Sequence, residues 1–111
     1  MDPIPMPWLK CQKVEDTYVL RDGASGLFLA ASGFPKNRET RAPLVSELLK
    51  VKDQLDPKYH FILSAPETDP EGRPAQVRFS RKAGAQYVMS EVDGKATKWK
   101  ATYNNGRWTV A

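Results

Sequence analysis

The last third of the chain decides the fold: residues 75–110 read AQVRFSRKAGAQYVMSEVDGKATKWKATYNNGRWTV. Ala-Gly-Ala, Asp-Gly-Lys and Asn-Gly steps divide this stretch into four short runs rich in aromatic and branched residues. Such runs, separated by glycine-containing turns, are typical of strands joined as hairpins. We therefore predict a four-stranded antiparallel meander here.

The turns also predict how these strands pair. A two-residue turn at the Asn-Gly step would place Tyr103 opposite Trp108. Three-residue turns at the other two glycine steps would place Phe79 opposite Met89, and Met89 opposite Trp99. A shift of one residue in any turn would move a whole strand to the opposite face, so this register is a specific prediction.

The predicted register gives the sheet one aromatic face and one basic face, because side chains alternate along each strand. The aromatic face would hold Val77, Phe79, Tyr87, Met89, Trp99, Ala101, Tyr103, Trp108 and Val110. The basic face would hold Arg78, Ser80, Lys82, Gln86, Ser90, Lys98, Lys100, Thr102 and Arg107. We expect the aromatic face to be covered by a helix from elsewhere in the chain.

The rest of the chain supplies that helix and a second β region. The proline-rich start MDPIPMPW predicts an extended arm, and TYVLRDGASGLFLAAS predicts a hairpin. Apolar residues at helical spacing predict an amphipathic helix over residues 43–55, with Pro43 in its first turn and Asp56-Pro57 at its end. ETDPEGRP is an acidic, turn-rich connector. We predict three regions: an arm and first β module at 1–42, the helix and connector at 43–72, and the second β module at 73–111.

Composition limits the function classes. The chain has 111 residues, 41% of them hydrophobic, and its single cysteine excludes an internal disulfide. It carries a net charge of +4, and the positive charge is concentrated in residues 73–111. Such asymmetry favours an anionic partner, nucleic acid first, although an ordinary solvated basic surface is the alternative. No apolar run is long enough for a membrane helix and no signal peptide is evident, so we expect a cytoplasmic protein.

Three segments, VLRDGASGLFLAASGFPKNRETRAP, DPEGRPAQVRFSRK and DGKATKW, together resemble the C-terminal zinc-ribbon-like region of the bacterial type IA DNA topoisomerases, the topoisomerase I family. The resemblance covers nearly the whole chain from Cys11 onward. It implies a β-rich α+β protein made of two degenerate zinc-ribbon-like antiparallel modules joined by one amphipathic helix. In relatives with intact ribbons, cysteines stand at the positions of Trp8, Cys11, Ala31 and Asn37. With one cysteine left, the resemblance implies a domain that binds no zinc and needs no cofactor.

The resemblance also implies a function. Type IA enzymes carry their tyrosine nucleophile and magnesium-binding acidic residues in an upstream catalytic core, so this chain would not be an enzyme on its own. It would bind single-stranded DNA and assist the relaxation of negatively supercoiled DNA, as a monomeric, nucleoid-associated region of the larger polypeptide. The alternative is a protein-interaction module that docks on RNA polymerase.

Sequence-tolerant binding of single strands requires cations for the phosphates and flat rings for the bases. The residues we expect to bind DNA are Phe34, Lys36, Arg38, Arg41, Arg78, Lys82, Lys98, Trp99, Lys100, Tyr103, Arg107 and Trp108. Tyr87 and Phe28 are further rings available for stacking. Each ring could instead belong to a core, and Glu39 could pair locally with a neighbouring arginine. His60, between Tyr59 and Phe61, is expected to be a packing residue, and we predict no catalytic or metal-binding residue.

Overall fold

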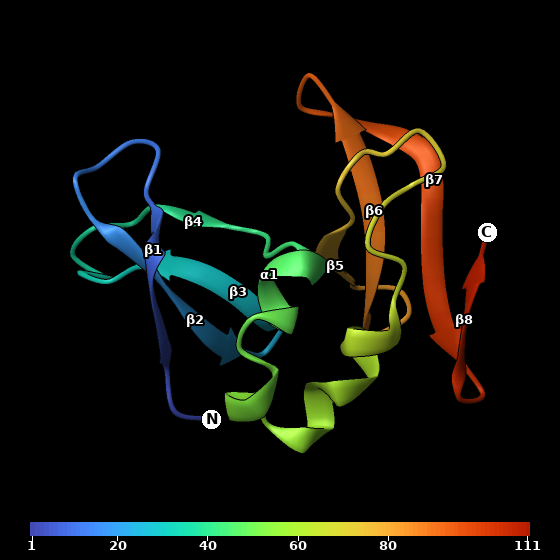
Figure 1. The fold of residues 1–111 in the computed structure, drawn as a ribbon, viewed down its shortest axis with the longest axis horizontal. Coiled ribbons are helices and arrows are strands. Elements are labelled where there is room, and N and C mark those ends of the chain that lie inside the picture. Colours follow the sequence, from blue (N-terminus) through green and yellow to red (C-terminus); the bar gives the residue numbers. More distant parts are fainter. The chain divides into compact units, whose positions relative to one another are not determined.

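The computed structural model describes all of residues 1–111, which form two compact units, Met1–Pro43 and Leu44–Ala111 (Figure 1). Each unit contains one four-stranded antiparallel sheet with its strands in sequence order. The prediction of a β-rich fold with two antiparallel modules is therefore confirmed. No helix is long and apolar enough to span a bilayer.

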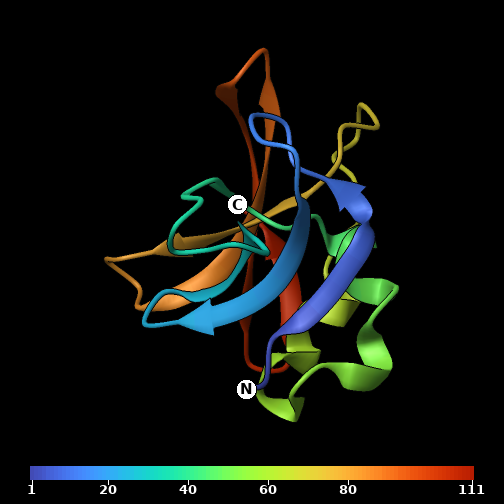
Figure 2. The ribbon, with the colours of Figure 1, turned by 90° about the vertical axis from the view of Figure 1, so that its left-hand side faces the viewer.

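The first unit is a single curved sheet, whose first two strands are blue in Figure 2. The predicted hairpin is present: its two strands pair from Tyr18 opposite Ala31 to Gly23 opposite Gly26. Gly26 has a φ of 85°, in the left-handed region that glycine adopts at no steric cost. The strands are β1 (Ile4–Lys10), β2 (Thr17–Gly23), β3 (Gly26–Ala31) and β4 (Thr40–Arg41).

The proline-rich start is a strand and not a free arm. β1 pairs with β2 at the edge of the sheet, with Ile4 opposite Leu20 and Met6 opposite Tyr18. Ile4 and Met6 are buried, whereas the prolines that alternate with them are exposed. An edge strand tolerates proline because one side of it needs no ladder hydrogen bonds. The alternation of proline with apolar residues was therefore a strand pattern.

The second unit begins with short helical segments instead of the predicted continuous helix. The α-helix α1 covers only Val45–Leu49, and 3₁₀ turns follow as η1 (Lys52–Gln54) and η2 (Pro57–Ser64). After Leu49 the amide hydrogen bonds run to the third preceding carbonyl, as from Val51 to Leu48 (3.1 Å). The apolar stripe does predict burial, since Leu48, Val51 and Leu55 are all buried. Their spacing suits the tighter 3₁₀ pitch as well as the α pitch, so packing decided the outcome.

The second sheet is the predicted four-stranded meander, in the order β5-β6-β7-β8. Its last hairpin has the predicted register, with Tyr103 opposite Trp108. The registers of the first two hairpins were predicted wrongly. Phe79 lies opposite Gln86, and Met89 lies opposite Lys100. The strands are β5 (Gln76–Ser80), β6 (Ala85–Val92), β7 (Lys95–Asn104) and β8 (Arg107–Val110).

Turn length explains both errors. The β5–β6 turn contains four residues, because Ser80 pairs with Ala85. The β6–β7 turn contains two, Asp93 and Gly94, both with positive φ (50° and 77°). A bulge between Met89 and Glu91 then shifts the pairing by two further residues, which preserves the faces. Each observed register therefore differs from the predicted register by an odd number of residues.

An odd shift on both sides turns β6 over relative to its neighbours. Tyr87 and Met89 lie on the face that carries Arg78 and Lys100, since Tyr87 pairs with Arg78 and Met89 with Lys100. Gln86 and Val88 lie on the aromatic face, where the sequence had placed Tyr87 and Met89. Ser90, at the bulge, is buried and donates a hydrogen bond to Asp69 (2.7 Å). The basic face therefore contains an aromatic ring that the sequence had placed opposite.

At β7 and β8 the aromatic face is covered by η2. The Phe61 ring lies 5.1 Å from the Tyr103 ring and stacks on Trp108 at 6.1 Å and 13°. The Trp108 indole Nε1 donates a hydrogen bond to the Phe61 carbonyl oxygen (2.9 Å). Since the ring centroids lie within the 4.5–7 Å typical of aromatic pairs, these three side chains form a packed cluster that attaches η2 to β7 and β8. His60 belongs to the same turn, where Nε2 lies 2.9 Å from the Leu55 carbonyl oxygen.

Replacing Trp108 by phenylalanine should therefore destabilise the second unit by about 1 kcal/mol, the usual worth of one hydrogen bond in a protein. This variant keeps a six-membered ring against Phe61, and it loses the five-membered ring with the N–H donor. Trp8→Phe is the matched control, because Trp8 is 48% exposed. Denaturant unfolding of both variants checks the prediction, and equal midpoints would show that the indole hydrogen bond contributes nothing.

Candidate nucleic-acid interface

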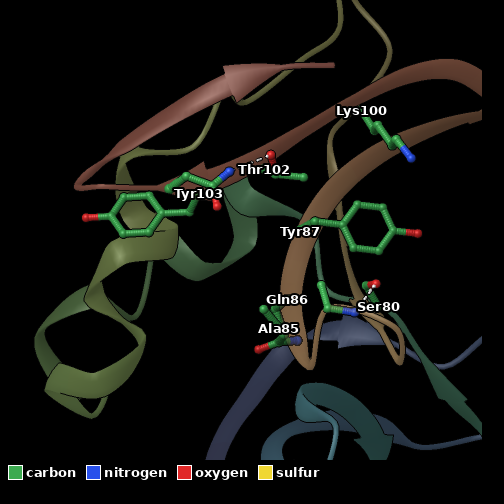
Figure 3. Close-up of a pocket in the computed structure, with 9 residues that line it drawn as sticks. Ser80, Ala85, Gln86, Tyr87, Lys100, Thr102 and Tyr103 are labelled. Carbon is green, nitrogen blue, oxygen red and sulfur yellow. Dashed lines mark hydrogen bonds between the residues drawn. The ribbon is translucent and has the colours of Figure 1, made fainter.

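The second sheet carries a cationic face, which we define by the exposed or half-buried residues that alternate with the aromatic face. Arg107 lies opposite Asn104 on this face, and Lys100 lies two residues from Thr102 along β7. Figure 3 shows Tyr87 and Lys100 directed to one side of the strands and Tyr103 to the other. The cationic face comprises Gln76, Arg78, Ser80, Ala85, Tyr87, Glu91, Ala96, Lys98, Lys100, Thr102, Asn104, Arg107 and Thr109.

The cations near this face differ in their availability. The Arg78 guanidinium is occupied, because Nη2 donates to Glu91 Oε2 (3.0 Å) and to Gln76 Oε1 (2.7 Å). Four other residues expected to bind DNA are exposed and form no ion pair: Lys82 in the β5–β6 turn, Lys98, Lys100 and Arg107. Charges without partners can neutralise phosphates without breaking an existing contact.

The expected aromatic residues divide between two environments. Trp99, Tyr103 and Trp108 lie on the aromatic face, and the last two are part of the Phe61 cluster. Tyr87, one of the further rings available for stacking, is half-buried on the cationic face and not on the aromatic face where it was predicted. The Asp-Gly step at 93–94 carried a signal for the correct face of Tyr87, because such a step favours a two-residue turn.

In the first unit, three side chains gather on one face of β2 and β3. Arg21 lies opposite Phe28, and the Phe28 ring meets the Phe34 ring edge-on at 6.2 Å. The Arg21 guanidinium carbon lies 6.0 Å from the centre of the Phe34 ring. Both rings are half-buried, so each presents an edge or face to solvent beside a cation.

The basic residues that follow Phe34 are spread over the neighbouring turn. Lys36 and Arg38 are exposed. Arg41 is half-buried, with its guanidinium 4.8 Å from the centre of the Tyr18 ring and Nη1 donating to the Ala42 carbonyl oxygen (3.1 Å). Arg41 therefore has a structural role in addition to its expected one.

Glu39 fastens the loop between β1 and β2. Its Oε1 accepts the backbone N–H groups of Lys13 (2.7 Å) and Val14 (3.2 Å), and its Oε2 accepts that of Gln12 (2.7 Å). The Tyr18 hydroxyl donates a further short hydrogen bond to Oε2. These bonds, the one from Tyr18 first, lower the pKa of Glu39 to about 2. Burial and the same carboxylate raise the pKa of Tyr18 to about 12, so the phenol stays protonated.

Asp16 holds the turn after β3 in the same way. Its carboxylate accepts hydrogen bonds from the Ser32 hydroxyl, the Gly33 N–H (3.0 Å) and Asn37 Nδ2 (3.2 Å). The Ser32 bond is the largest cause that lowers the pKa of Asp16 to about 2. Burial and then the nearby carboxylates raise the pKa of the Cys11 thiol, which disfavours a thiolate there. Two carboxylates thus organise the two loops at residues 11–16 and 32–39.

Asp69 organises the acidic connector of the second unit. The side chain is 3% exposed, and burial alone would raise its pKa. Hydrogen bonds from Ser90 Oγ (2.7 Å), the Arg73 N–H (2.9 Å) and the Glu71 N–H (2.8 Å) outweigh burial and lower the pKa to about 2. Arg73 Nη1 adds an ion pair at 3.1 Å.

The three carboxylates predict that the fold loses stability in acid. Their pKa values are about 2 in the folded chain, against ordinary values of 3.8 for aspartate and 4.5 for glutamate. A carboxyl group with a lowered folded pKa contributes stability above its unfolded pKa and loses it as pH falls through the folded value. Thermal unfolding midpoints should therefore be constant above about pH 5 and fall steadily toward about pH 2. Midpoints that do not change over this range would contradict these hydrogen-bond assignments.

The chain therefore consists of two small four-stranded antiparallel β modules, the second of which carries cations without ion-pair partners around a half-buried ring. The family model described as topoisomerase I zinc-ribbon-like matches residues 5–41 and 72–111, so the chain belongs to the topoisomerase I zinc-ribbon-like family. It is 68% identical over 110 residues to DNA topoisomerase 1 of Pseudomonas aeruginosa, and 57% identical over 107 residues to DNA topoisomerase 1 of Escherichia coli. These matches cover 99% and 96% of this chain but only 13% and 12% of the two relatives.

The family description raises the question of zinc, and the residues do not fit it. Structural zinc sites use four cysteine or histidine ligands in tetrahedral arrangement. No group of three or more histidine, cysteine, aspartate or glutamate side chains is placed to hold a metal ion. Asn37, at a position implied to hold a cysteine in zinc-binding relatives, donates a hydrogen bond to Asp16 (3.2 Å). Hydrogen bonds to carboxylates occupy the place where metal ligation would otherwise fix the loops.

Proposed function

We propose that this chain is a non-catalytic, C-terminal, single-stranded-DNA-binding region of a type IA topoisomerase. It would hold a strand near a catalytic core located elsewhere in the same polypeptide and so assist relaxation of negatively supercoiled DNA. The observation that carries the proposal is the cationic face of the second sheet. Lys98, Lys100 and Arg107 lie there without ion-pair partners, around the half-buried ring of Tyr87.

The chemistry of this face suits single strands better than duplex. Cations that follow the backbone together with rings that accept unstacked bases give binding that depends little on sequence. A duplex offers no free base faces to Tyr87. The half-buried Phe28 and Phe34 rings beside Arg21, with exposed Lys36 and Arg38 in the following turn, form a second candidate contact in the first unit.

The experiment that tests the proposal is a titration with fluorescent single-stranded and duplex oligonucleotides at several salt concentrations. Four or five neutralised phosphates on a single strand should give a slope of log K against log salt of about −3. Tighter binding of duplex, or binding that salt does not change, would contradict the proposal. Salt-insensitive binding to RNA polymerase would instead favour a protein-interaction module.

A further inference from the structure

The hydrogen-bonded ladder between β6 and β7 does not include the first residues of β6 or the last residues of β7. It runs from Val92 opposite Lys95 to Val88 opposite Ala101 and includes no pair beyond that point. β7 continues through Asn104, where its pairing is with β8, and β6 begins at Ala85, where its pairing is with β5. The two strands therefore diverge, as the curvature of β7 in Figure 1 shows.

A pocket of about 350 Å³ lies where the strands separate (Figure 3). Its volume falls within the roughly 300–1,000 Å³ of small-molecule sites. Residues from both faces of the sheet line the pocket. Ser80, Tyr87, Lys100, Thr102 and Asn104 come from the cationic face, and Gln86 and Tyr103 come from the aromatic face. No acidic residue lines it.

The lining combines three kinds of group that a nucleotide needs. Tyr87 offers a ring for a base, and the exposed Lys100 ammonium, which has no ion-pair partner, offers a charge for a phosphate. Thr102 Oγ1 accepts a hydrogen bond from Asn104 Nδ2 (3.1 Å), so the Thr102 hydroxyl hydrogen remains available to donate.

The remaining polar groups extend this pattern. Ser80 Oγ accepts the Ala83 N–H (3.1 Å), and its own hydrogen can likewise turn toward a ligand. The Asn104 side-chain carbonyl oxygen can accept a further hydrogen bond. Donors and an acceptor thus lie around one cavity beside a ring and a cation.

From these observations we infer that the pocket between β6 and β7 holds one nucleotide of a bound single strand, with its base against Tyr87 and its phosphate at Lys100. The inference rests on the proposed function and makes it more specific. Cations that only follow the backbone treat all bases alike, whereas this pocket gives one position of the strand a requirement for a base and a preference among bases.

The test compares a 12-nucleotide oligodeoxythymidine with a 12-unit abasic strand of equal charge. Wild-type protein should bind the thymidine strand more tightly. Tyr87→Ala should weaken binding of the thymidine strand by about 5- to 100-fold and leave abasic binding unchanged, because one base contact is lost. Tyr87→Phe retains the ring and should retain the affinity.

Two matched pairs of variants separate the contribution of charge to affinity from the recognition of the base. Lys100→Gln should weaken both strands by about fivefold in 0.1 M salt, whereas Lys95→Gln, at the other end of β7, should have a smaller effect. Thr102→Val should change the relative affinities for homopolymers of the four bases. Thr109→Val should not, because exposed Thr109 pairs with Thr102 but lies outside the pocket.

The outcomes distinguish the pocket from the wider function. If wild-type protein binds single strands and Tyr87→Ala changes nothing, or weakens both strands equally, the pocket inference is wrong and the proposed function stands. If wild-type protein binds no single strand, the proposed function fails. Amide chemical shifts during titration with thymidine monophosphate then decide the inference: shifts at Ser80, Tyr87 and Thr102 support the pocket, and their absence overturns it.

Discussion

Replacing Glu39 by glutamine should lower the unfolding temperature of the first unit by roughly 10 °C, one of the larger effects expected from a single substitution in a small domain. Glutamine keeps the shape of the side chain but puts an NH₂ group where an oxygen now accepts hydrogen bonds. The N–H groups of Gln12 and Lys13 would each face fewer acceptors, and the Tyr18 hydroxyl would lose a charged partner. Backbone donors without acceptors are costly because they have given up their water.

Glu15→Gln is the matched control, because Glu15 lies in the same loop, is exposed and undergoes the same chemical change. Amide signals from residues 1–43, followed as temperature rises, report the first unit separately from the second. Equal midpoints for the two variants would mean that the Glu39 hydrogen bonds do not hold the loop. A loss that appears only in the signals of residues 44–111 would contradict the assignment as well.

Replacing both Lys98 and Lys100 by glutamine should weaken single-strand binding by about 25-fold in 0.1 M salt. Each neutralised phosphate releases about 0.7 of a counterion from a single strand, which corresponds to about fivefold at this salt concentration. The slope of log K against log salt should also become about 1.4 less steep. Both lysines are exposed on one strand and form no ion pair, so the fold should be unaffected.

The control removes the same charge elsewhere in the second unit. Lys50 and Lys52 are exposed and belong to the helical segment, so their double replacement by glutamine should change affinity much less. Equal losses for the two double variants would show that net charge alone drives binding. No loss for the Lys98 and Lys100 variant would remove the cationic face from the interface.

The sequence predicted the architecture because local signals and the final packing agree there. The Asn105-Gly106 step has both residues at positive φ, and the turn chemistry that places Tyr103 opposite Trp108 requires this. The first hairpin, in β2 and β3, was equally local. By contrast, the helix predicted over 43–55 depended on a spacing that two kinds of helix satisfy, and burial of Val51 and Leu55 did not require the α form.

The candidate site was harder to predict, because it depends on the parity of turn lengths. The Asp93-Gly94 step carries the same two-residue signal as Asn105-Gly106, whereas the four-residue β5–β6 turn has no comparably strong signature. The turns on the two sides of β6 each differ by one residue from the predicted length. These two errors were enough to place Tyr87 on the wrong face. The carboxylates of Asp16 and Glu39 were also hidden from the sequence, since their partners are mostly backbone N–H groups distant along the chain.

The central claim is that a single strand of DNA lies on the cationic face of the second sheet. Photocrosslinking of the 111-residue protein to a single strand containing photoreactive thymine analogues, followed by peptide mapping, tests this claim most directly. We predict that crosslinks in the second unit fall on Tyr87 and on the β7 residues beside it, and that excess unlabelled single strand removes them. Crosslinks confined to the helical segments at 44–64, or to Phe61 and Trp108 on the opposite face, would contradict the account.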